Sequence, residues 1–233
     1  MKIGYWNING LAAHEEELRE HLRGPPRYDV FAVGEAKVKE GVKAPRFDGF
    51  EKPRVLASNS CKIACRGTVV YVNENNGITS EVIHRNGRYR GTDIEVFLLD
   101  IKKKRDEQYR MKVLFVYRPP RAEKLEWVIG DIYEKHLKSS AFLIIGDFNV
   151  DLIGNPGYNP LQGKIEFVPY KGKKNVPTFV NQGGDSTLID HIWASNRVIN
   201  SYNKPNATRK EGTPGVQSYH YIIAITLNKR KKR

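Results

Sequence analysis

Short apolar runs separated by polar segments dominate the hydrophobic pattern of this chain. Runs of about four to eight residues that are almost continuously apolar, or rich in β-branched and aromatic side chains, are typical of strands covered on both faces. The predicted strands are Lys2–Trp6, Val30–Gly34, Thr68–Val72, Ile94–Ile101, Met111–Val116, Ala141–Gly146, Leu188–Trp193 and His220–Leu227. This pattern predicts a fold built around sheets with both faces buried.

Two segments carry helical signals instead. Glu15–Arg23 is rich in charged, helix-forming residues, and the sequence Gly24-Pro25-Pro26 ends it. In Glu123–Lys138 the apolar residues form a single stripe, as in a surface helix that packs on a sheet. The segments expected to form loops are Gly154–Asn175, Asn196–Gln217 and a Gly-Gly hairpin at Gln182–Ser186.

The length of 233 residues suits one compact domain with a large core. We expect this domain to span residues 1–228 and the run Lys229–Arg233 to form a basic tail. No apolar run approaches the roughly 20 residues that a membrane-spanning helix needs, so we expect no membrane partner. Cys61 and Cys65 are too few for a disulfide framework, which indicates a reducing compartment.

The net charge of the chain narrows the class of molecules that it is expected to bind. The chain carries 39 Lys and Arg residues against 26 Asp and Glu residues, a formal net charge of +13. Such a surface attracts polyanions, and each phosphate that it neutralises releases counterions. Nucleic-acid binding is therefore favoured over a surface that only confers solubility. The basic tail is open to three interpretations: a nuclear address, the stub of an interdomain linker, or a solvated end.

Polar residues interrupt the apolar runs at the ends of the predicted strands. Strands of a two-layer sandwich deliver their terminal residues to a rim, so we expect these side chains to converge there. A single acid at a strand end is more often a cap or turn residue, but six such positions together favour a site. The six residues are Asn7, Glu35, Tyr117, Asp147, Asp190 and His220.

The chemistry of this group suits phosphodiester hydrolysis. Carboxylate and amide oxygens with a single histidine favour a hard divalent cation such as Mg²⁺. Asp147 and Asn149 are two residues apart on a turn, so one can act as a base and the other as a neutral donor that does not repel an anionic substrate. A histidine held by an aspartate keeps its orientation and, when protonated, stabilises a phosphorane-like transition state.

Five motifs in this order resemble those of the exonuclease–endonuclease–phosphatase superfamily. They are Trp6–Leu11, Gly34–Lys37, Tyr117–Pro120, Gly146–Asn149 and Thr187–Ile192. The Asn-Ile-Asn-Gly-Leu and Tyr-Arg-Pro-Pro elements, with Pro177-Thr178-Phe179, are most similar to the apurinic-type endonuclease domains of non-LTR retrotransposons. The resemblance extends from Ile3 to about Ile225. It implies an α/β fold, the deoxyribonuclease-like four-layer αββα sandwich with two packed mixed β-sheets.

The resemblance also implies roles for individual residues. Glu35 would bind Mg²⁺, for which Mn²⁺ could substitute, and Asn7 would steady the metal or the phosphate. Tyr117 would donate a hydrogen bond to the scissile phosphate. Asp147 would activate the attacking water, and Asn149 would hold a phosphate oxygen.

In the same comparison Asp190 would orient His220, and His220 would face the scissile phosphate. The expected activity is a Mg²⁺-dependent DNA endonuclease that nicks one strand of double-stranded DNA and leaves a 3′-hydroxyl. That hydroxyl would prime reverse transcription by a separate domain of the same polyprotein. A nuclear, monomeric protein is expected.

Some features depart from the family pattern. The chain reads Ser218-Tyr219-His220 where the family usually reads Ser-Asp-His. Loss of an outer-shell support of this kind commonly costs about 10- to 100-fold in metal affinity or activity. The segment between Asn149 and Thr178 is short and glycine-rich, where many relatives carry a helix. Asn9 replaces an acid that is frequent in repair-type relatives, which favours the retrotransposon branch over abasic-site repair.

Three alternatives are weighed against the endonuclease. An abasic-site repair endonuclease is the nearest, and a phosphatase or phospholipase on the same fold is disfavoured by the basic surface and the Tyr-Arg-Pro-Pro element. A catalytically weakened nucleic-acid-binding domain is suggested by Tyr219, but retention of the other site residues opposes it.

Loops over the rim are expected to contact DNA, chiefly Gln182–Ser186 and Asn196–Gln217, and the tip Lys102–Arg105 is a further basic hairpin. Phosphate contacts of this kind give affinity without choice of sequence. The candidate DNA-binding residues are Asn9, Arg118, Arg197, Lys204, Arg209 and Lys210.

Overall fold

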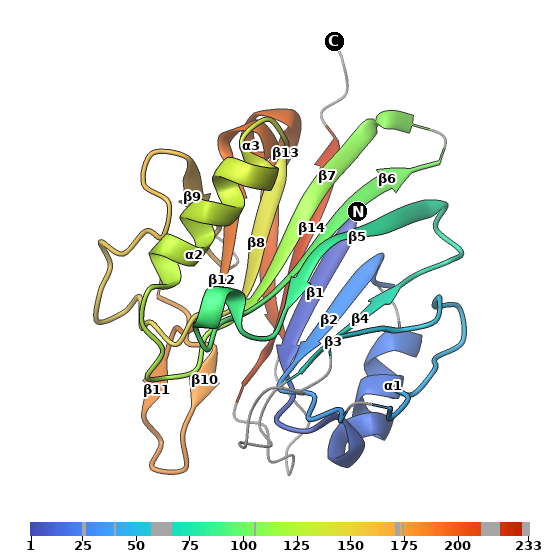
Figure 1. The fold of residues 1–233 in the computed structure, drawn as a ribbon, viewed down its shortest axis with the longest axis horizontal. Coiled ribbons are helices and arrows are strands. Elements are labelled where there is room, and N and C mark those ends of the chain that lie inside the picture. Colours follow the sequence, from blue (N-terminus) through green and yellow to red (C-terminus); the bar gives the residue numbers. More distant parts are fainter. Residues whose placement is uncertain are drawn as a thin grey trace.

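The computed structural model describes residues 1–24, 27–39, 41–56, 67–104, 106–170, 173, 175–210 and 220–229. Within these ranges the chain forms two six-stranded sheets and one two-stranded hairpin. Helix α1 covers the outer side of one sheet and α2 the outer side of the other, while α3 connects β12 of one sheet to β13 of the other at the end of the sheets (Figure 1). The predicted four-layer αββα sandwich is confirmed.

The elements fall into three groups. The first sheet, in the order β13-β14-β1-β2-β4-β3, contains β1 (Lys2–Asn7), β2 (Val30–Gly34), β3 (Arg54–Leu56), β4 (Thr68–Val72), β13 (Tyr202–Lys210) and β14 (Ile222–Lys229). The second, in the order β5-β6-β7-β8-β12-β9, contains β5 (Ile78–Asn86), β6 (Glu95–Lys103), β7 (Asp106–Tyr117), β8 (Phe142–Asp147), β9 (Ile165–Phe167) and β12 (Asp190–Ser195). The hairpin and helices are β10 (Phe179–Val180), β11 (Ser186–Thr187), α1 (Glu15–Arg23), α2 (Leu125–Ile132), α3 (Asn196–Ser201) and the short helical turns η1 (Leu11–His14), η2 (Tyr89–Gly91) and η3 (Tyr133–Leu137).

Strand direction brings the predicted site together. Each sheet has a parallel pair, β1 with β2 and β7 with β8, so the carboxyl ends of these four strands share a rim. Strands β12 and β14 run antiparallel to β8 and β1 and therefore begin at that rim. In the second sheet Tyr117 pairs with Asp147, and Asp147 pairs with Asp190.

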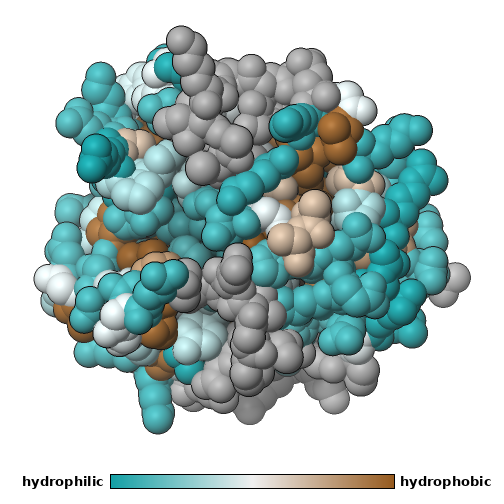
Figure 2. Space-filling model, turned by 90° about the horizontal axis from the view of Figure 1, so that it is seen from below, coloured by the Kyte–Doolittle hydropathy of each residue, from teal (hydrophilic) through white to brown (hydrophobic). Residues whose placement is uncertain are grey.

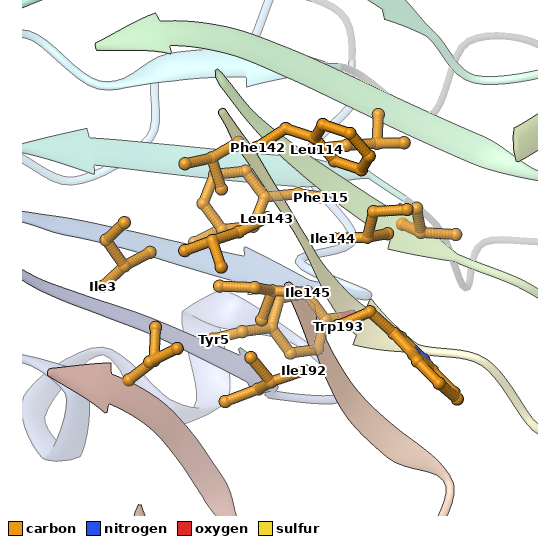
Figure 3. Close-up of a cluster of buried hydrophobic side chains, with 14 of the residues drawn as sticks. Ile3, Tyr5, Leu114, Phe115, Phe142, Leu143, Ile144, Ile145, Ile192 and Trp193 are labelled. Atoms are coloured by element: carbon orange, nitrogen blue, oxygen red, sulfur yellow. The ribbon is translucent and has the colours of Figure 1, made fainter. Parts of the chain in front are cut away.

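The main core lies between the two sheets. Ile3, Ile145 and Ile192 are fully buried, and Figure 3 shows them within one cluster of side chains from β1, β8 and β12. Full burial of a side chain of this size contributes about 1.5–3 kcal/mol. A second cluster places Leu18 and Leu22 of α1 against the outer face of the first sheet. The packing therefore fixes the strands whose ends carry the polar residues.

Several expected elements have the predicted type and nearly the predicted bounds. Glu15–Arg23, Val30–Gly34 and Thr68–Val72 are confirmed as predicted. The helix expected over 123–138 begins at Leu125 and finishes as a π-helical turn. The Gly-Gly hairpin is confirmed between β10 and β11.

The loop expected over Asn196–Gln217 is wrong for its described part, which forms α3 and β13. The Ser195 hydroxyl caps α3 by accepting a hydrogen bond from the Val198 amide (3.4 Å). Pro205 lies at a register shift of β13, an edge strand, where its missing N–H breaks no ladder. Strand β5 was also missed, because it is an edge strand with largely polar, partly exposed side chains.

Three further expectations concern the basic tail, the two cysteines and membrane-spanning segments. Strand β14 runs through Lys229, the first residue of the expected tail, and residues 230–233 lie outside the described residues, as do Cys61 and Cys65. Among the described helices, none is long and apolar enough to cross a membrane.

Candidate active site

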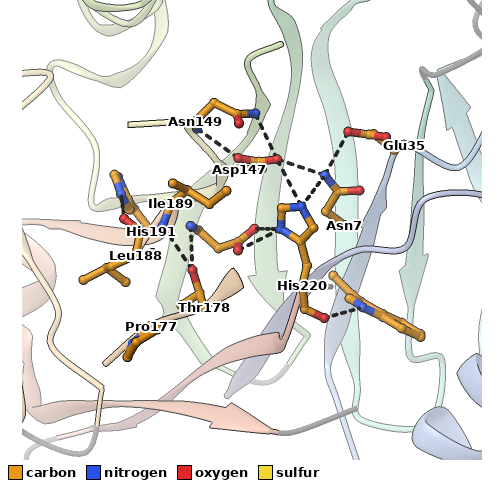
Figure 4. A network of polar contacts seen from close by, with 12 residues as sticks. Asn7, Glu35, Asp147, Asn149, Pro177, Thr178, Leu188, Ile189, His191 and His220 are labelled. Atoms are coloured by element: carbon orange, nitrogen blue, oxygen red, sulfur yellow. Dashed lines mark hydrogen bonds and ion pairs between the residues drawn. The ribbon is translucent and has the colours of Figure 1, made fainter. Parts of the chain in front are cut away.

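The polar residues at the strand ends converge on one rim of the sandwich. Figure 4 shows Asn7, Glu35, Asp147 and His220 pointing toward one another from both sheets. Asn7 and Asp147 are each 1% exposed, so the centre of the group is withdrawn from bulk water. Figure 2 looks onto this lower side of the molecule, where the described surface is largely hydrophilic. The expected convergence is confirmed in position.

The Asn7 carboxamide joins the two sheets. Its Nδ2 donates to Glu35 Oε1 (3.0 Å) and to Asp147 Oδ2 (2.9 Å). Because an amide nitrogen carries two hydrogens, both are used by carboxylates. His220 Nε2 lies 3.5 Å from the same nitrogen, but both atoms are donors when the ring is protonated, so this is a close approach and not a hydrogen bond.

Asn149 holds Asp147 in place. The Asn149 backbone N–H donates to Asp147 Oδ1 (2.9 Å), and Asn149 Nδ2 donates to Asp147 Oδ2 (3.2 Å). The left-handed backbone of Asn149, with φ of 47°, is one that asparagine tolerates better than most residues. Burial raises the pKa of the Asp147 carboxyl to about 7, although the His220 charge opposes it. A carboxylate tuned to this range is suited to accept a proton at neutral pH.

His220 is held by Asp190. Its Nδ1 lies 3.0 and 3.2 Å from the two Asp190 carboxylate oxygens. Burial alone lowers the pKa of His220, but the Asp190 carboxylate, followed by Asp147 and Glu35, raises it to about 9. The ring is therefore protonated at neutral pH, and its Nε2 faces Asp147 Oδ2 at 3.9 Å.

Tyr117 and Glu35 form the other side of the group. Burial, and then the Glu35 carboxylate, raise the pKa of the Tyr117 hydroxyl far above its ordinary value. The hydroxyl therefore stays protonated and can donate a hydrogen bond. Glu35 has a left-handed backbone, with φ of 47°, and strained backbone of this kind is frequent at functional sites.

The donor set fits a divalent cation. Carboxylates of Glu35, Asp147 and Asp190 meet a single histidine, and ligand atoms of Asp147, Asp190 and His220 lie within 4.8 Å of one another. Both Asp190 oxygens are already used by His220. Burial is the main cause of the raised pKa of Asp147, and a cation bound beside this carboxylate would lower the pKa again. The expected roles of Glu35 and Asn7 toward a metal stay predictions.

Comparison with known proteins agrees with this geometry. The family model described as "Endonuclease/Exonuclease/phosphatase family" matches residues 4–203. The chain belongs to this family. None of the curated proteins compared with the chain matches it.

Solved structures share the fold at low identity. The 3′-5′ exonuclease NExo from Neisseria meningitidis is 13% identical with a TM-score of 0.68, over 98% of this chain and 100% of that one. The endonuclease domain of TRAS1, a telomere-specific non-LTR retrotransposon, is 15% identical with a TM-score of 0.67, over 99% of each chain. The AP endonuclease LMAP from Leishmania major is 15% identical with a TM-score of 0.71, over 99% of this chain and 88% of that one. At these identities the likeness shows the family fold alone.

Sequence reasoning missed three residues that support the pair formed by His220 and Asp190. The fully buried Thr178 hydroxyl accepts hydrogen bonds from the Asp190 amide (2.9 Å) and the Ile189 amide (3.2 Å). Trp6 Nε1 donates to the His220 carbonyl (3.2 Å), and the Phe179 ring lies 4.7 Å from the imidazole. Thr178 and Phe179 were noticed only as part of a motif, because their contacts join segments that are distant in the chain.

Glu95 was missed as well. This carboxylate is 1% exposed and accepts hydrogen bonds from the Gly67 amide (3.0 and 3.3 Å) and the Thr68 hydroxyl (3.3 Å). The Gly67 carbonyl in turn accepts from the Ala36 amide (2.9 Å), next to Glu35. Glu95 therefore links the second sheet to the backbone that carries Glu35. The signal was available, since Glu95 is an acid at the start of an apolar strand.

The residues predicted to contact DNA differ in whether they lie beside the site. Asn9 is exposed beside the site and accepts a hydrogen bond from Lys37 Nζ (2.8 Å). The Arg118 guanidinium donates to three backbone carbonyls at 2.7, 3.2 and 2.9 Å, so it braces the rim internally. Arg209 donates to the Pro177 carbonyl (2.6 Å) and lies over the Tyr221 ring. Their roles toward DNA stay predictions.

Arg197 is not brought to the site. It follows the end of β12 that is opposite Asp190, and its guanidinium donates to the Ser139 carbonyl. The expected loop over the rim does not form there because α3 begins at Asn196, at the far end of the sheet. The side chains of Lys204 and Lys210, and all of Tyr219, lie outside the described residues.

Proposed function

We propose that this family member is a Mg²⁺-dependent DNA endonuclease of the retrotransposon type, which nicks one strand and leaves a 3′-hydroxyl. The contact of Asn7 with Asp147 and His220 carries the proposal. It places a carboxylate with a pKa of about 7 beside a histidine with a pKa of about 9, at a rim of a basic protein. A proton acceptor and a cationic donor are the two groups that phosphodiester hydrolysis needs.

The residues have distinct roles in this proposal. Asp147 accepts the proton of the attacking water, while the two hydrogen bonds from Asn149 fix its carboxylate. Protonated His220, oriented by Asp190, presents Nε2 to the phosphate and stabilises the developing negative charge. Tyr117 donates a hydrogen bond to a phosphate oxygen. In this structure Asn149 Nδ2 donates to the Arg118 carbonyl (2.7 Å) as well as to Asp147, and its expected contact with a phosphate oxygen stays a prediction.

Glu35, with Asn7 beside it, would hold Mg²⁺, and Mn²⁺ would substitute for it. The bound cation would neutralise negative charge on the scissile phosphate. Glu35 is positioned for this by the chain of hydrogen bonds that runs from Glu95 through Gly67 to Ala36.

The choice between a retrotransposon-type endonuclease and an abasic-site repair endonuclease rests on fewer observations. The TRAS1 neighbour is an endonuclease domain of a non-LTR retrotransposon, whereas the LMAP neighbour is an AP endonuclease. The Tyr-Arg-Pro-Pro element and the uncharged Asn9 support the retrotransposon branch. In that setting the protein would act in the nucleus as a monomer, and a reverse transcriptase domain of the same polyprotein would extend the nick.

The proposal is tested with three substrates in Mg²⁺: a supercoiled plasmid, a duplex with one abasic site, and an oligonucleotide with a 3′-phosphate. The endonuclease nicks the intact plasmid, and a DNA polymerase extends the nick without further processing. Cleavage confined to the abasic duplex would indicate repair, and release of phosphate alone would indicate a phosphatase. Tight DNA binding without hydrolysis would instead indicate a catalytically weakened binding domain.

A further inference from the structure

A hollow lies outside the Asp147 network, between η2 and the segment that leads into α2. Its volume is about 720 Å³, and its lining includes Arg90, Thr92, Arg121, Lys124 and Trp127. It belongs to the second sheet alone and shares none of its lining residues with the active site. Its residue types, three cations and an indole, call for a ligand with both negative charge and a flat apolar face.

Trp127 is the unusual residue of this hollow. Among the described residues, three large apolar side chains are exposed, and Trp127, at 46%, is the aromatic one. The Arg90 guanidinium carbon lies 5.7 Å from the centre of the Trp127 indole, and the Tyr89 ring meets it edge-on at 6.5 Å. The indole is thus flanked by Arg90 and Tyr89 at the surface. Aromatic rings and guanidinium planes of this kind are the surfaces on which unpaired bases stack.

Backbone strain marks the same place. Six described residues other than glycine have a positive φ. Four of them, Asn9, Glu35, Lys37 and Asn149, belong to the active site or its edge. The other two are Arg90, with φ of 46°, and Lys124, with φ of 67°, and both line the hollow. Strained residues persist where the surrounding structure fixes them, and they cluster at ligand sites.

The charges favour an anion. Arg90, Arg121 and Lys124 face the hollow together with two carboxylates, those of Asp93 and Glu123. The Asp93 carboxylate lies 3.5 Å from Arg88 Nε, so its charge is already shared. Arg90 Nε likewise lies 3.5 Å from the Asp131 carboxylate, so its charge is shared as well. The remaining cations of the lining, Arg121 and Lys124, outnumber the remaining carboxylate, Glu123, so the net charge toward the hollow is positive and favours contact with a phosphate.

The hollow is joined to the active site by a short, braced segment. The Ala122 carbonyl, at the hollow, accepts a hydrogen bond from Arg118 Nε (2.7 Å). Arg118 Nη1 donates to the Asn149 carbonyl (2.9 Å), and Asn149 Nδ2 donates to Asp147 (3.2 Å). The wall of the hollow and the Asp147 carboxylate are therefore linked by one continuous chain of hydrogen bonds.

We propose that this hollow binds an unpaired nucleotide of the DNA on which the active site works, with the base stacked on Trp127 and the phosphates beside Arg121 and Lys124. The inference rests on the proposed function for the identity of its ligand. Paired bases keep their faces inside the duplex and cannot stack on an indole. The hollow therefore selects DNA that carries a single-stranded segment next to the duplex to be cut.

Tryptophan fluorescence gives a direct test, performed in EDTA so that hydrolysis does not enter. The chain has three tryptophans, and the other two, Trp6 and Trp193, are 1% and 2% exposed. Direct contact of a base is therefore expected to quench Trp127, and the variant without this indole separates that signal from a change at Trp6, which lies beside His220. A single-stranded oligodeoxynucleotide should quench the emission of the native protein, whereas Trp127→Phe should remove the quenchable signal.

Affinity provides the second readout. Native protein should bind a duplex with a single-stranded overhang about tenfold more tightly than a blunt duplex, because base–aromatic stacking is worth roughly that factor or more. Trp127→Ala should abolish this preference, and Trp127→Phe should retain most of it. Lys138→Ala is the matched control, since this exposed residue follows the same helical segment, pairs with Glu134 and lies outside the hollow. It should keep the full preference.

Absence of quenching, or an unchanged preference in Trp127→Ala, would overturn the inference. Tighter binding of an RNA strand of the same sequence would overturn DNA as the ligand. Failure of the proposed function is seen separately, because a protein that shows the overhang preference but never nicks in Mg²⁺ lacks the endonuclease activity alone. A protein that nicks plasmid but shows no quenching lacks the hollow's role alone.

Discussion

Replacing Asp190 by asparagine removes the charge that holds His220 protonated. The Asp190 carboxylate lies 3.0 and 3.2 Å from His220 Nδ1, and the pKa of the histidine rises from 6.5 to about 9. A difference of roughly 2.5 between the folded and unfolded pKa values corresponds to about 3 kcal/mol. Because the folded protein binds this proton more tightly, the stabilisation is fully present below pH 6.5. It is lost as the pH rises through 9.

The measurement uses metal-free protein. In the native chain, an imidazole NMR titration should place the His220 midpoint near pH 9, and in Asp190→Asn the midpoint should fall by more than one unit. Urea unfolding between pH 6 and 10 should show a loss of up to about 3 kcal/mol in the native chain and a smaller loss in the variant, where only Asp147 and Glu35 still raise the pKa of His220. A native His220 that titrates near 6.5, or parallel stability profiles for the two proteins, would refute the electrostatic reasoning.

Three further predictions concern stability. His191 is fully buried, and Trp193 Nε1 donates a hydrogen bond to its Nδ1 (3.4 Å). Burial lowers the pKa of His191 to about 4, so urea unfolding should show that the free energy of unfolding falls by about 3 kcal/mol between pH 6.5 and 4. An equal loss in His191→Gln would contradict this. The Tyr5 hydroxyl is buried without a hydrogen-bond partner among the described residues, so Tyr5→Phe should leave stability unchanged or raise it by about 1 kcal/mol, whereas a lower melting temperature would show a missed partner. A Cβ at Gly146 would lie 1.8 Å from the Val116 carbonyl oxygen, so Gly146→Ala should destabilise by about 3 kcal/mol or more, and an unchanged melting temperature would exclude this close approach.

The strand-end residues could be predicted because their signal is local. Asn7, Glu35 and Asp147 each end or follow an apolar run, and the direction of parallel strands alone brings such ends to one edge of a sheet. The sandwich follows from the same runs, since strands that are apolar on both faces need cover on both sides.

The supporting contacts could not be predicted in the same way. Thr178 holds Asp190, and Glu95 holds Gly67, across separations that no periodic pattern records. Strand β13 was missed because an edge strand needs few apolar residues, and Arg197 was placed at the wrong end because a sequence does not show where the chain leaves a sheet. Side-chain reach and chain direction, rather than local propensity, decide these features.

The most direct test of the account is plasmid nicking by Asp147→Asn beside a matched variant, Asp100→Asn. Asp100 is also a buried carboxylate, 2% exposed, but it pairs with Arg110 Nη2 (2.6 Å) toward the other end of the second sheet. In Mg²⁺ the native chain and Asp100→Asn should nick supercoiled DNA. Asp147→Asn should be slower by about 10²- to 10⁴-fold, the usual contribution of a general base, and EDTA should stop all three proteins. Equal nicking by the Asp147→Asn and Asp100→Asn proteins, or nicking that persists in EDTA, would contradict a metal-dependent site built on Asp147.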